Sequence, residues 1–394
     1  MVISNELNNK TLVVVQLNGG NDFMNTVVPY GNGLYRDFRP IVGVDQEHIT
    51  PIDDYIGFNN DVAPINDLYN KGQVAIIQGV GYPNSSRSHF RSMDIWHTCE
   101  PDIVANEGWL GKTVRMIDPS TENPLTAVSF GRGLPRALTA QEVMVTSVGD
   151  LDTYGLMSGI QAKEQKAQAL DLFKRVYTPA IGSGLIQDYL GRTGVDVIRG
   201  ADMLKKAPQM YKSSVEYGDN AIAKSLRDVA RVHLAGLGTR IFYTQHGGYD
   251  THANEVPTHP KLLTDLSGAI GDFFQDLSDH DADQDVVMLV FTEFGRRIKD
   301  NASGTDHGSG GGAFVIGPSV KGGLFSEYPS LDPSEHDQGD LKHTYDFRGL
   351  YSTLLERWMG IDPTEIVGGT YAVSYTHLRA HETRHDLVCR LLLE

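Results

Sequence analysis

Residues 11–22 read TLVVVQLNGGND, an apolar, β-branched run that ends in a cluster of asparagine, glycine and aspartate. A short continuous apolar run bounded by such residues is typical of a strand that is buried on both faces of a sheet. The residues that follow it favour a turn. The stretch therefore predicts a buried strand, with Asp22 placed directly beyond its carboxyl end.

The same pattern recurs along the chain and alternates with helical patterns. Further candidates for buried strands are residues 73–80, 125–130, 240–244, 286–291 and 313–316. The clearest helical pattern covers residues 261–277, where leucine, isoleucine and phenylalanine recur at helical spacing. Strands that alternate with helices predict an α/β fold, with a mostly parallel central sheet covered by helices on both faces.

Residues from about 159 to 237 have a different character. They are rich in polar residues, form amphipathic helical patterns and contain no convincing strand. We expect them to be a helical insertion, acting either as a lid or as a packing element, on a single domain that covers residues 1–372. The chain has 394 residues, 40% of them hydrophobic, which is enough for a substantial core.

The last stretch, residues 373–394, reads VSYTHLRAHETRHDLVCRLLLE and resembles a translated sequencing adapter. We exclude it from the fold and the function, and we expect the natural C-terminus to be missing. Four residues thereby leave the set of candidate ligands, namely His377, His381, His385 and Cys389. Cys99 is then the one remaining cysteine, so no intrachain disulfide is expected.

The charge balance excludes several classes of partner. The chain has 34 lysines and arginines against 50 aspartates and glutamates, a formal net charge of −16, without a basic run. This balance argues against nucleic acids and anionic membranes as partners bound through a broad basic patch. No apolar stretch is long enough to cross a bilayer, and residues 1–17 lack the basic and apolar regions of an export signal.

Ligand-type residues follow one of the later strands. Residues 245–259 read QHGGYDTHANEVPTH and place Asp250 and His252 just after the strand expected at 240–244. The two adjacent glycines allow the backbone to turn tightly there. In α/β sheets, ligands bind at the carboxyl ends of the strands. This loop is therefore a candidate metal-binding segment.

Similar residues follow another strand, where Glu293 and then Asp306 and His307 come after the run at 286–291. Mixed carboxylate and imidazole ligands suit a divalent metal, here Zn²⁺, Mn²⁺, Mg²⁺ or Ca²⁺, and their number is sufficient for two ions. Two adjacent ions can serve displacement at phosphorus or sulfur. We expect five of these residues to converge in one crevice, namely Asp22, Asp250, His252, Asp306 and His307.

Each residue also has a structural interpretation. A single aspartate after a strand commonly caps a turn or a helix. Glu293 could form an ion pair with Arg296 or Arg297. The remaining histidines of these segments are expected to be mainly structural, with His246 in a loop, His89 and His97 on the core side of a helix, and His259 as an alternative to His252.

Several segments, in order along nearly all of residues 11–368, resemble a bacterial family called DUF1501, which is grouped with the alkaline phosphatase and sulfatase superfamily. They are LVVVQLNGGNDFMNTVVPYGNGLYRDFRP (12–40), SRSHFRSMDIWHT (86–98), GWLGK (108–112), GGYDTHANE (247–255), TEFGRRIKDNASGTDHGSGG (292–311) and DFRGLYSTLLERW (346–358). The resemblance implies an alkaline phosphatase-like fold and an exported protein.

The resemblance also implies roles for particular residues. Asp22 matches the metal-binding aspartate that follows the first strand, and the pairs Asp250–His252 and Asp306–His307 match metal ligands of the superfamily. The segment PNSSRSHF (83–90) occupies the place of the nucleophile at a helix N-terminus, a position that favours anions. Its candidate catalytic residues are Ser85 or Ser86 as nucleophile and Arg87 as an anion clamp.

These observations together predict a metal-dependent hydrolase of phosphate or sulfate esters, acting on a small molecule or a polymer. Two departures from the superfamily pattern support an alternative. Glu293 stands where many relatives have an Asp-His pair, and Pro83 precedes the serines instead of following a nucleophile. The alternative is a non-catalytic binding or surface protein that retains the same fold.

Overall fold

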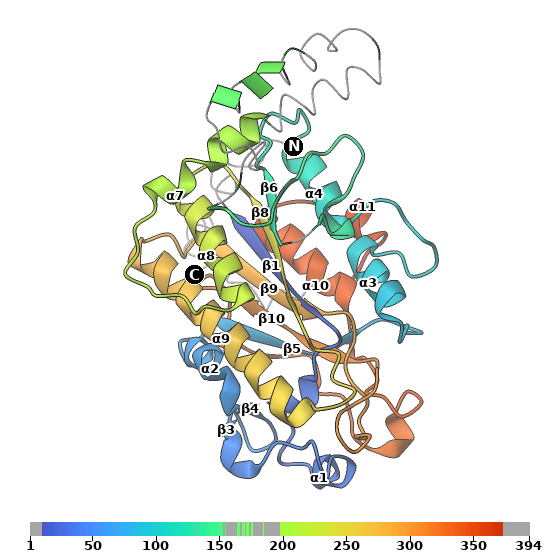
Figure 1. The fold of residues 1–394 in the computed structure, drawn as a ribbon. Coiled ribbons are helices and arrows are strands. Elements are labelled where there is room, and N and C mark those ends of the chain that lie inside the picture. The colour runs from blue at the N-terminus through green and yellow to red at the C-terminus, as the bar shows by residue number, and fades with distance from the viewer. Residues whose placement is uncertain are drawn as a thin grey trace, which may run out of the picture.

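The computed structural model describes residues 10–131, 133–152, 154 and 198–372, together with residues 164, 165, 168, 169, 171, 172, 175 and 184. The adapter-like segment 373–394 and most of residues 159–197 of the expected insertion lie outside the described residues. Within the described part, a twisted central sheet is enclosed by helices on its two faces (Figure 1).

The strands of the central sheet lie in the spatial order β11-β5-β10-β9-β1-β8-β6-β7, and β12 pairs with β5. Their bounds are Thr11–Asn18 (β1), Val74–Gly81 (β5), Ala127–Phe130 (β6), Thr146–Val148 (β7), Ile241–Gly247 (β8), Val286–Thr292 (β9), Gly311–Ile316 (β10), Gly323–Phe325 (β11) and Tyr345–Asp346 (β12). All pairs are parallel except those of β10, which runs antiparallel to both β5 and β9. The mostly parallel sheet and the six expected strands are confirmed.

The central position of β1 follows from its sequence. Its residues from Thr11 to Leu17 are all buried, and Val14 lies between Tyr243 of β8 and Leu289 of β9. Alternate side chains enter opposite layers, because successive residues of a strand point to opposite faces. Val13 and Val15 therefore join one hydrophobic core, and Leu12 and Val14 join the other.

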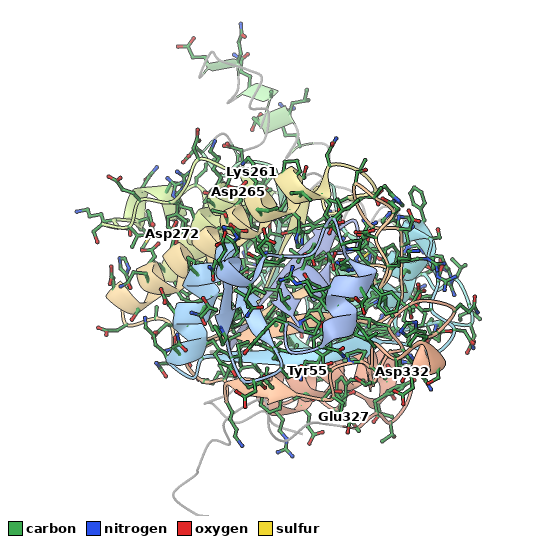
Figure 2. All side chains as sticks on the ribbon, turned by 90° about the horizontal axis from the view of Figure 1, so that it is seen from below. Tyr55, Lys261, Asp265, Asp272, Glu327 and Asp332 are labelled. Carbon is green, nitrogen blue, oxygen red and sulfur yellow. The ribbon has the colours of Figure 1, made fainter. Side chains whose placement is uncertain are left out.

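In the described part of the chain, helices form the two layers that cover the sheet. One face is covered by α2 (Ala63–Asn70), α8 (Ala221–Leu234) and α9 (Glu255–Asp279), and the other by α3 (His89–Thr98), α4 (Trp109–Ile117) and α10 (Phe347–Thr353). The expected helix at 261–277 forms the larger part of α9, which buries Leu263, Ile270 and Phe273. Figure 2 shows Lys261, Asp265 and Asp272 on its outer side, so this long helix is amphipathic.

The smaller elements complete the fold. A second sheet contains β2 (Val27–Val28), β3 (Ile49–Pro51) and β4 (Gly57–Asn59), and the short helices are α1 (Gly33–Phe38), α7 (Ala207–Met210) and α11 (Thr364–Val367). Short 3₁₀ helices cover Phe23–Asn25, Gln46–His48, Asn60–Val62, Arg136–Leu138 and Pro333–Glu335, and a π-helical segment, Leu354–Met359, continues α10. Among the described residues, no helix combines the length and the apolar character needed to span a bilayer.

The sheet topology brings several loops to one edge. In the parallel register, Asn18 of β1 lies opposite Gly247 of β8, and Leu17 of β1 lies opposite Thr292 of β9, so these three strands end together. Because β10 is antiparallel to β9, the loop between them begins and ends at that same edge. The segment after β5 also begins there, since β5 runs in the same direction as β9.

Candidate metal centre

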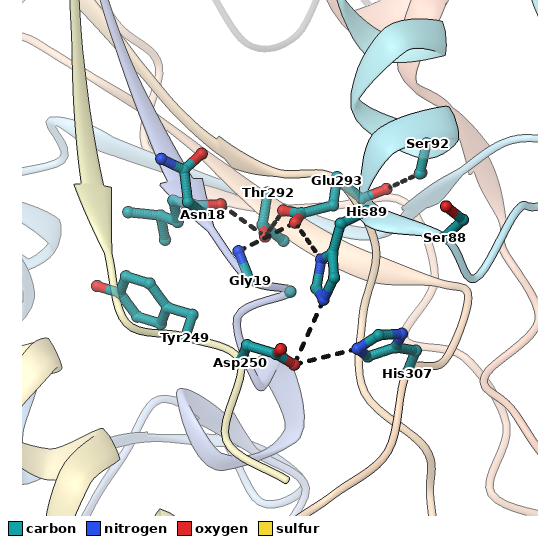
Figure 3. Close-up of polar contacts among 12 residues, drawn as sticks. Asn18, Gly19, Ser88, His89, Ser92, Tyr249, Asp250, Thr292, Glu293 and His307 are labelled. Carbon is teal, nitrogen blue, oxygen red and sulfur yellow. Dashed lines mark hydrogen bonds and ion pairs between the residues drawn. The ribbon is translucent and has the colours of Figure 1, made fainter. Parts of the chain in front are cut away.

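Three histidine rings converge on a single carboxylate oxygen, Oδ1 of Asp250. Figure 3 shows two of them, His89 and His307, beside Asp250. The distances from this oxygen to the Nε2 atoms are 3.0 Å for His252, 3.0 Å for His307 and 3.4 Å for His89. Asp250, His89 and His307 form a group whose ligand atoms all lie within 4.8 Å of one another. We call Asp250, His89, His252 and His307 the histidine cluster.

The residues of the histidine cluster come from three loops at the shared sheet edge. Asp250 and His252 follow β8, His307 lies in the connection from β9 to β10, and His89 is the first residue of α3. The turn after β1 passes so close to the backbone of Asp250 that it requires a glycine. Gly19 has a φ of +120°, and a Cβ at this position would lie 2.3 Å from the backbone nitrogen of Asp250.

Each ring of the cluster is oriented by an acceptor at its other nitrogen. Nδ1 of His89 lies 2.8 Å from Oε1 of Glu293, Nδ1 of His252 lies 3.0 Å from Oδ1 of Asp306, and Nδ1 of His307 lies 2.7 Å from the carbonyl oxygen of Arg87. Because carboxylates and carbonyls only accept hydrogen bonds, each Nδ1 carries the proton and donates. In a neutral ring, Nε2 then presents a lone pair.

Those lone pairs have no adequate partner within the described part of the chain. Nε2 of His252 and Nε2 of His307 are 2.9 Å apart, and two unprotonated nitrogens at that distance repel. Nε2 of His89 is buried and forms no hydrogen bond with any described residue. A divalent cation would accept all three lone pairs and the Asp250 charge, and histidines held through Nδ1 by a carboxylate or carbonyl are typical of metal ligands. The donor set therefore fits a metal.

Charge around the cluster favours an ionised Asp250. Burial opposes its ionisation, but the hydrogen bond and the charge of Arg296 outweigh this effect and lower the pKa of Asp250 to about 2. Nη2 of Arg296 lies 2.9 Å from Oδ1 of Asp250, and its fully buried guanidinium also donates to backbone carbonyls of Gly20 and Thr305. Arg296 thus ties together the turns that carry the cluster.

Glu293 stands behind His89. Its side chain is almost fully buried, and Oε1 accepts hydrogen bonds from the backbone N–H of Gly19 at 3.0 Å and from Nδ1 of His89. The hydroxyl of Thr292 donates to its other oxygen at 2.9 Å. The hydrogen bond from His89 to Glu293 raises the pKa of His89. The carboxylate of Glu293 therefore contacts Gly19, His89 and Thr292, and it forms no described ion pair with Arg296 or Arg297.

Asp306 acts on His252 in a similar way. It is an exposed residue, and its Oδ1 also accepts a hydrogen bond from Nδ2 of Asn301 at 3.1 Å. The hydrogen bond from His252 lowers the pKa of Asp306. Asp306 therefore lies with the cluster, as expected, but its described contact is with the outer nitrogen of His252.

Asp22 differs from expectation. It caps the 3₁₀ helix Phe23–Asn25, and its buried carboxylate forms an ion pair with Arg39, which is also buried. Burial opposes ionisation, but the charge of Arg39 outweighs it and lowers the pKa of Asp22 to about 2. The expectation that Asp22 would converge with Asp250 is corrected, because the carboxylate of Asp22 accepts a hydrogen bond from the backbone N–H of Asn25 and pairs with Arg39.

The candidate catalytic residues lie near the cluster but have other partners. The backbone N–H of Ser86 donates to the hydroxyl of Tyr82, and Oγ of Ser86 accepts from the backbone N–H of Ser88. Helix α3 begins only at His89, with Ser88 as its N-cap, so Ser85 and Ser86 lie before the helix terminus. The guanidinium of Arg87 forms an ion pair with the fully buried Asp340 at 2.6 Å.

A cavity of about 740 Å³ opens beside the cluster. Asn18, Gly19, Ser88, His89, Asp250 and Glu293 contribute to its lining. The cavity therefore reaches the Asp250 side of the cluster and includes Ser88, whereas Ser85 and Ser86 are not among its lining residues. Ser88 is exposed, and its side chain makes no capping hydrogen bond to α3.

Among the expectations for the other histidines, the one for His97 is correct and those for His89 and His246 are wrong. His97 is in the core, as expected, with Nε2 at 2.7 Å from Oε1 of Gln16. His89 was expected in the core but faces Asp250, and its position at the start of a helix after a strand end was the signal for this. His246 lies in β8 rather than in a loop, buried beside the hydroxyl of Tyr249. His259, the alternative to His252, is buried next to Asn21.

Comparisons with known proteins give a family and several similar solved structures. The model of a family described as "Protein of unknown function (DUF1501)" matches residues 78–381. Similar solved structures include the lipoteichoic acid synthase LtaP from Listeria monocytogenes, with 10% identity, a TM-score of 0.41 and coverage of 94% of this chain and 78% of that chain. Another is a protein of the alkaline phosphatase superfamily from Vibrio parahaemolyticus, with 10% identity, a TM-score of 0.39 and coverage of 91% and 68%. No curated protein matches the sequence.

Proposed function

The chain belongs to the DUF1501 family, and on that premise we propose that it is a metal-dependent hydrolase of phosphate or sulfate esters. One observation carries the proposal, namely the three Nε2 atoms gathered around Oδ1 of Asp250. Rings held through Nδ1 with their Nε2 atoms turned toward one carboxylate are arranged as a ligand set. Surface histidines without a ligand role would not require all three rings to take this orientation.

The metal would be held by the histidine cluster, with Glu293 and Asp306 orienting His89 and His252. A set rich in imidazole favours Zn²⁺, because Mg²⁺, Ca²⁺ and Mn²⁺ prefer ligand sets richer in oxygen atoms. When bound, the ion would supply Lewis-acid polarisation of a phosphoryl or sulfuryl oxygen. The buried Arg296 adds a fixed positive charge beside Asp250 and would help to attract an anionic ester.

The nucleophile is proposed among three serines. The family resemblance favours Ser85 or Ser86, and the cavity lining adds Ser88, whose side chain makes no hydrogen bond to the helix it caps. A serine hydroxyl that attacks phosphorus or sulfur would lose its proton and displace the alcohol of the ester, which leaves the phosphate or sulfate group bound to the serine. Water would then hydrolyse this intermediate, releasing phosphate or sulfate and restoring the serine. Arg87 could clamp the anionic group only by exchanging Asp340 for the substrate, because its guanidinium is paired with that carboxylate.

Elemental analysis and an activity panel test the proposal. We expect protein purified without chelator to contain a stoichiometric divalent metal, and His252→Gln to lose it. The panel contains aryl phosphate monoesters and diesters, phosphonates and sulfates, each with and without added divalent ions. Single replacements of Ser85, Ser86 and Ser88 by alanine identify the nucleophile. Absence of both metal and ion-dependent turnover would overturn the proposal.

A non-catalytic binding protein is the second candidate. The ion pair between Arg87 and Asp340 favours it, because it occupies the residue that was expected to clamp the substrate. The placement of Ser85 and Ser86 outside the cavity lining favours it as well. This candidate is supported if the protein binds a metal stoichiometrically but turns over no ester in the panel.

A further inference from the structure

We propose that the cavity beside the histidine cluster binds the organic part of the ester, and that this part is an uncharged apolar group such as an aryl ring. The inference rests on the proposed hydrolase function and assigns its substrate class. It depends on three features of the cavity, which are its continuity with the cluster, its apolar side and the pairing of its charges.

The cavity is continuous with the site of the proposed reaction. Asp250, His89 and Glu293 contribute to one side, and residues of α3 and of the loop after it contribute to the rest. Its volume of about 740 Å³ is within the range of small-molecule sites. A phosphate or sulfate group at the cluster would therefore leave space in the cavity for the organic group attached to it.

Apolar side chains contribute to the lining of the cavity. They are Phe90, Met93 and Val104. Phe90 is 92% exposed and Val104 is 71% exposed, which makes them two of the most exposed large apolar residues described. Apolar surface that remains in water next to a cavity commonly marks a binding site, because covering it is favourable. Phe90 lines the cavity with its ring exposed, so the ring is available to stack on a bound aromatic group.

The charged residues of the cavity are paired with one another. Arg91 and Arg136 are the cationic side chains among the lining residues, and both form ion pairs with Asp94. Arg91 also donates to the carbonyl oxygens of Pro101 and Ile103. Burial lowers the pKa of His97, a further lining residue, to about 4, so its ring is neutral.

A substrate with a second anionic group would find no unpaired cation among the lining residues. Compounds with several phosphates or sulfates are therefore disfavoured in this cavity, and the overall charge of −16 repels them further. An aryl alcohol that carries a single phosphate or sulfate ester has one anionic group for the cluster and an apolar ring for the cavity. Its anionic end would lie at the cluster, and its ring would lie against Phe90 and Val104.

Binding of 2-naphthol, an aryl alcohol product, tests the inference without depending on turnover. Its dissociation constant is measured by fluorescence titration of the full chain loaded with Zn²⁺. We expect saturable binding, and we expect Phe90→Ala to weaken it about 3- to 10-fold, as for the loss of an aromatic pair. Met116→Ala is the matched control, because Met116 is also exposed and does not line the cavity; its affinity should equal that of the wild type.

A second variant separates this inference from the proposed function. His252→Gln alters the cluster at a residue that does not line the cavity, so it should lose Zn²⁺ in a calorimetric titration and keep its affinity for 2-naphthol. Absence of any stoichiometric divalent metal and of ion-dependent turnover, with the Phe90 effect intact, overturns the hydrolase and supports the apolar subsite. Non-saturable 2-naphthol binding, or equal effects of Phe90→Ala and Met116→Ala, overturns the subsite whatever the metal result.

Discussion

Oδ1 of Asp250 is the atom around which the candidate site is organised. Three imidazole nitrogens and one guanidinium lie within 3.4 Å of it, and each of these groups comes from a different position in the sequence. The carboxylate is ionised at neutral pH, because Arg296 stabilises its charge against the cost of burial. It supplies the negative charge that a divalent cation needs in this ligand set.

Replacing Asp250 by asparagine should therefore weaken metal binding more than replacing His246 by glutamine. The first change removes an anionic ligand, whereas His246 is buried beside Tyr249 in β8. An indirect partner of a metal site typically changes affinity by about 10–100-fold, and we expect Asp250→Asn to exceed this range. Calorimetric zinc titrations give both values. A larger loss for His246→Gln would make that residue a direct ligand.

Glu255 is a second residue with unusual electrostatics. It lies in the buried network of Asp22 and Arg39, where Asn25 and Thr305 donate hydrogen bonds to its two oxygens. Burial, together with the neighbouring charge of Asp22, raises the pKa of Glu255 to about 9. Glu255 is thus protonated at neutral pH, and it shares a proton with Asp22 in a hydrogen bond between the two carboxyl groups.

This raised pKa predicts a pH dependence of stability. Between about pH 4.5 and 9 the unfolded state has lost a proton that the folded state keeps, so the free energy of unfolding decreases as pH rises. Glu255→Gln mimics the protonated form and removes this decrease. We expect a higher urea midpoint than wild type at about pH 8.5 and a smaller difference at about pH 5. The exposed Glu335→Gln is the control, and parallel pH curves for Glu255→Gln and wild type would refute the assignment.

At the scale of elements, α8 lies in the part of the chain that was expected to be a helical insertion. Its described residues pack against the sheet, and Ile222, Leu226 and Val229 are fully buried in the same core as β1. Asn220 caps its first turn by accepting a hydrogen bond from the backbone N–H of Ala223. The described end of the expected insertion is therefore a covering helix of the sheet.

A truncation in α8 tests that role. Leu226→Ala should lower the free energy of unfolding by about 2–5 kcal/mol, because it removes buried methyl groups and leaves a cavity. Met210→Ala in the neighbouring α7 is the control, since Met210 is an exposed apolar residue. Chemical denaturation of both variants gives the comparison. If the two changes cost equally little, α8 contributes no more to the core than a surface appendage does.

At the scale of the whole molecule, the candidate metal centre connects loops that are far apart in sequence. The segment after β5, the loop after β8 and the connection from β9 to β10 each contribute a ring or a carboxylate. A ligand that binds the folded state and not the unfolded state stabilises the fold by mass action. A metal bound by the histidine cluster would therefore stabilise the entire domain.

Removal of the metal should lower the melting temperature. At a free Zn²⁺ concentration of about 100 times its dissociation constant, binding contributes about 2.7 kcal/mol to stability. Thermal melts in Zn²⁺ and in chelator measure the difference, and we expect His252→Gln to melt at the same temperature in both. A wild type whose melting is insensitive to chelator would indicate that no metal is bound at this site.

The placement of candidate residues could be predicted in part. Asp250, His252, Asp306 and His307 lie together because each follows a strand, and parallel strands end at a common edge. Asp22 also follows a strand, yet its carboxylate turns to Arg39. His89 was misplaced because the orientation of the first residue of a helix depends on where the helix begins, and here the cap is Ser88.

The sequence by itself determined six strands of a mostly parallel sheet and the long covering helix that contains residues 261–277. Apolar runs and helical spacing are local patterns, and burial of those residues selects the same elements in the folded chain. Only the tertiary structure decided which ligands meet, since that depends on the antiparallel placement of β10, the close approach allowed by Gly19 and the pairing of Arg39 with Asp22. These are contacts between residues distant in sequence, and no local pattern encodes them.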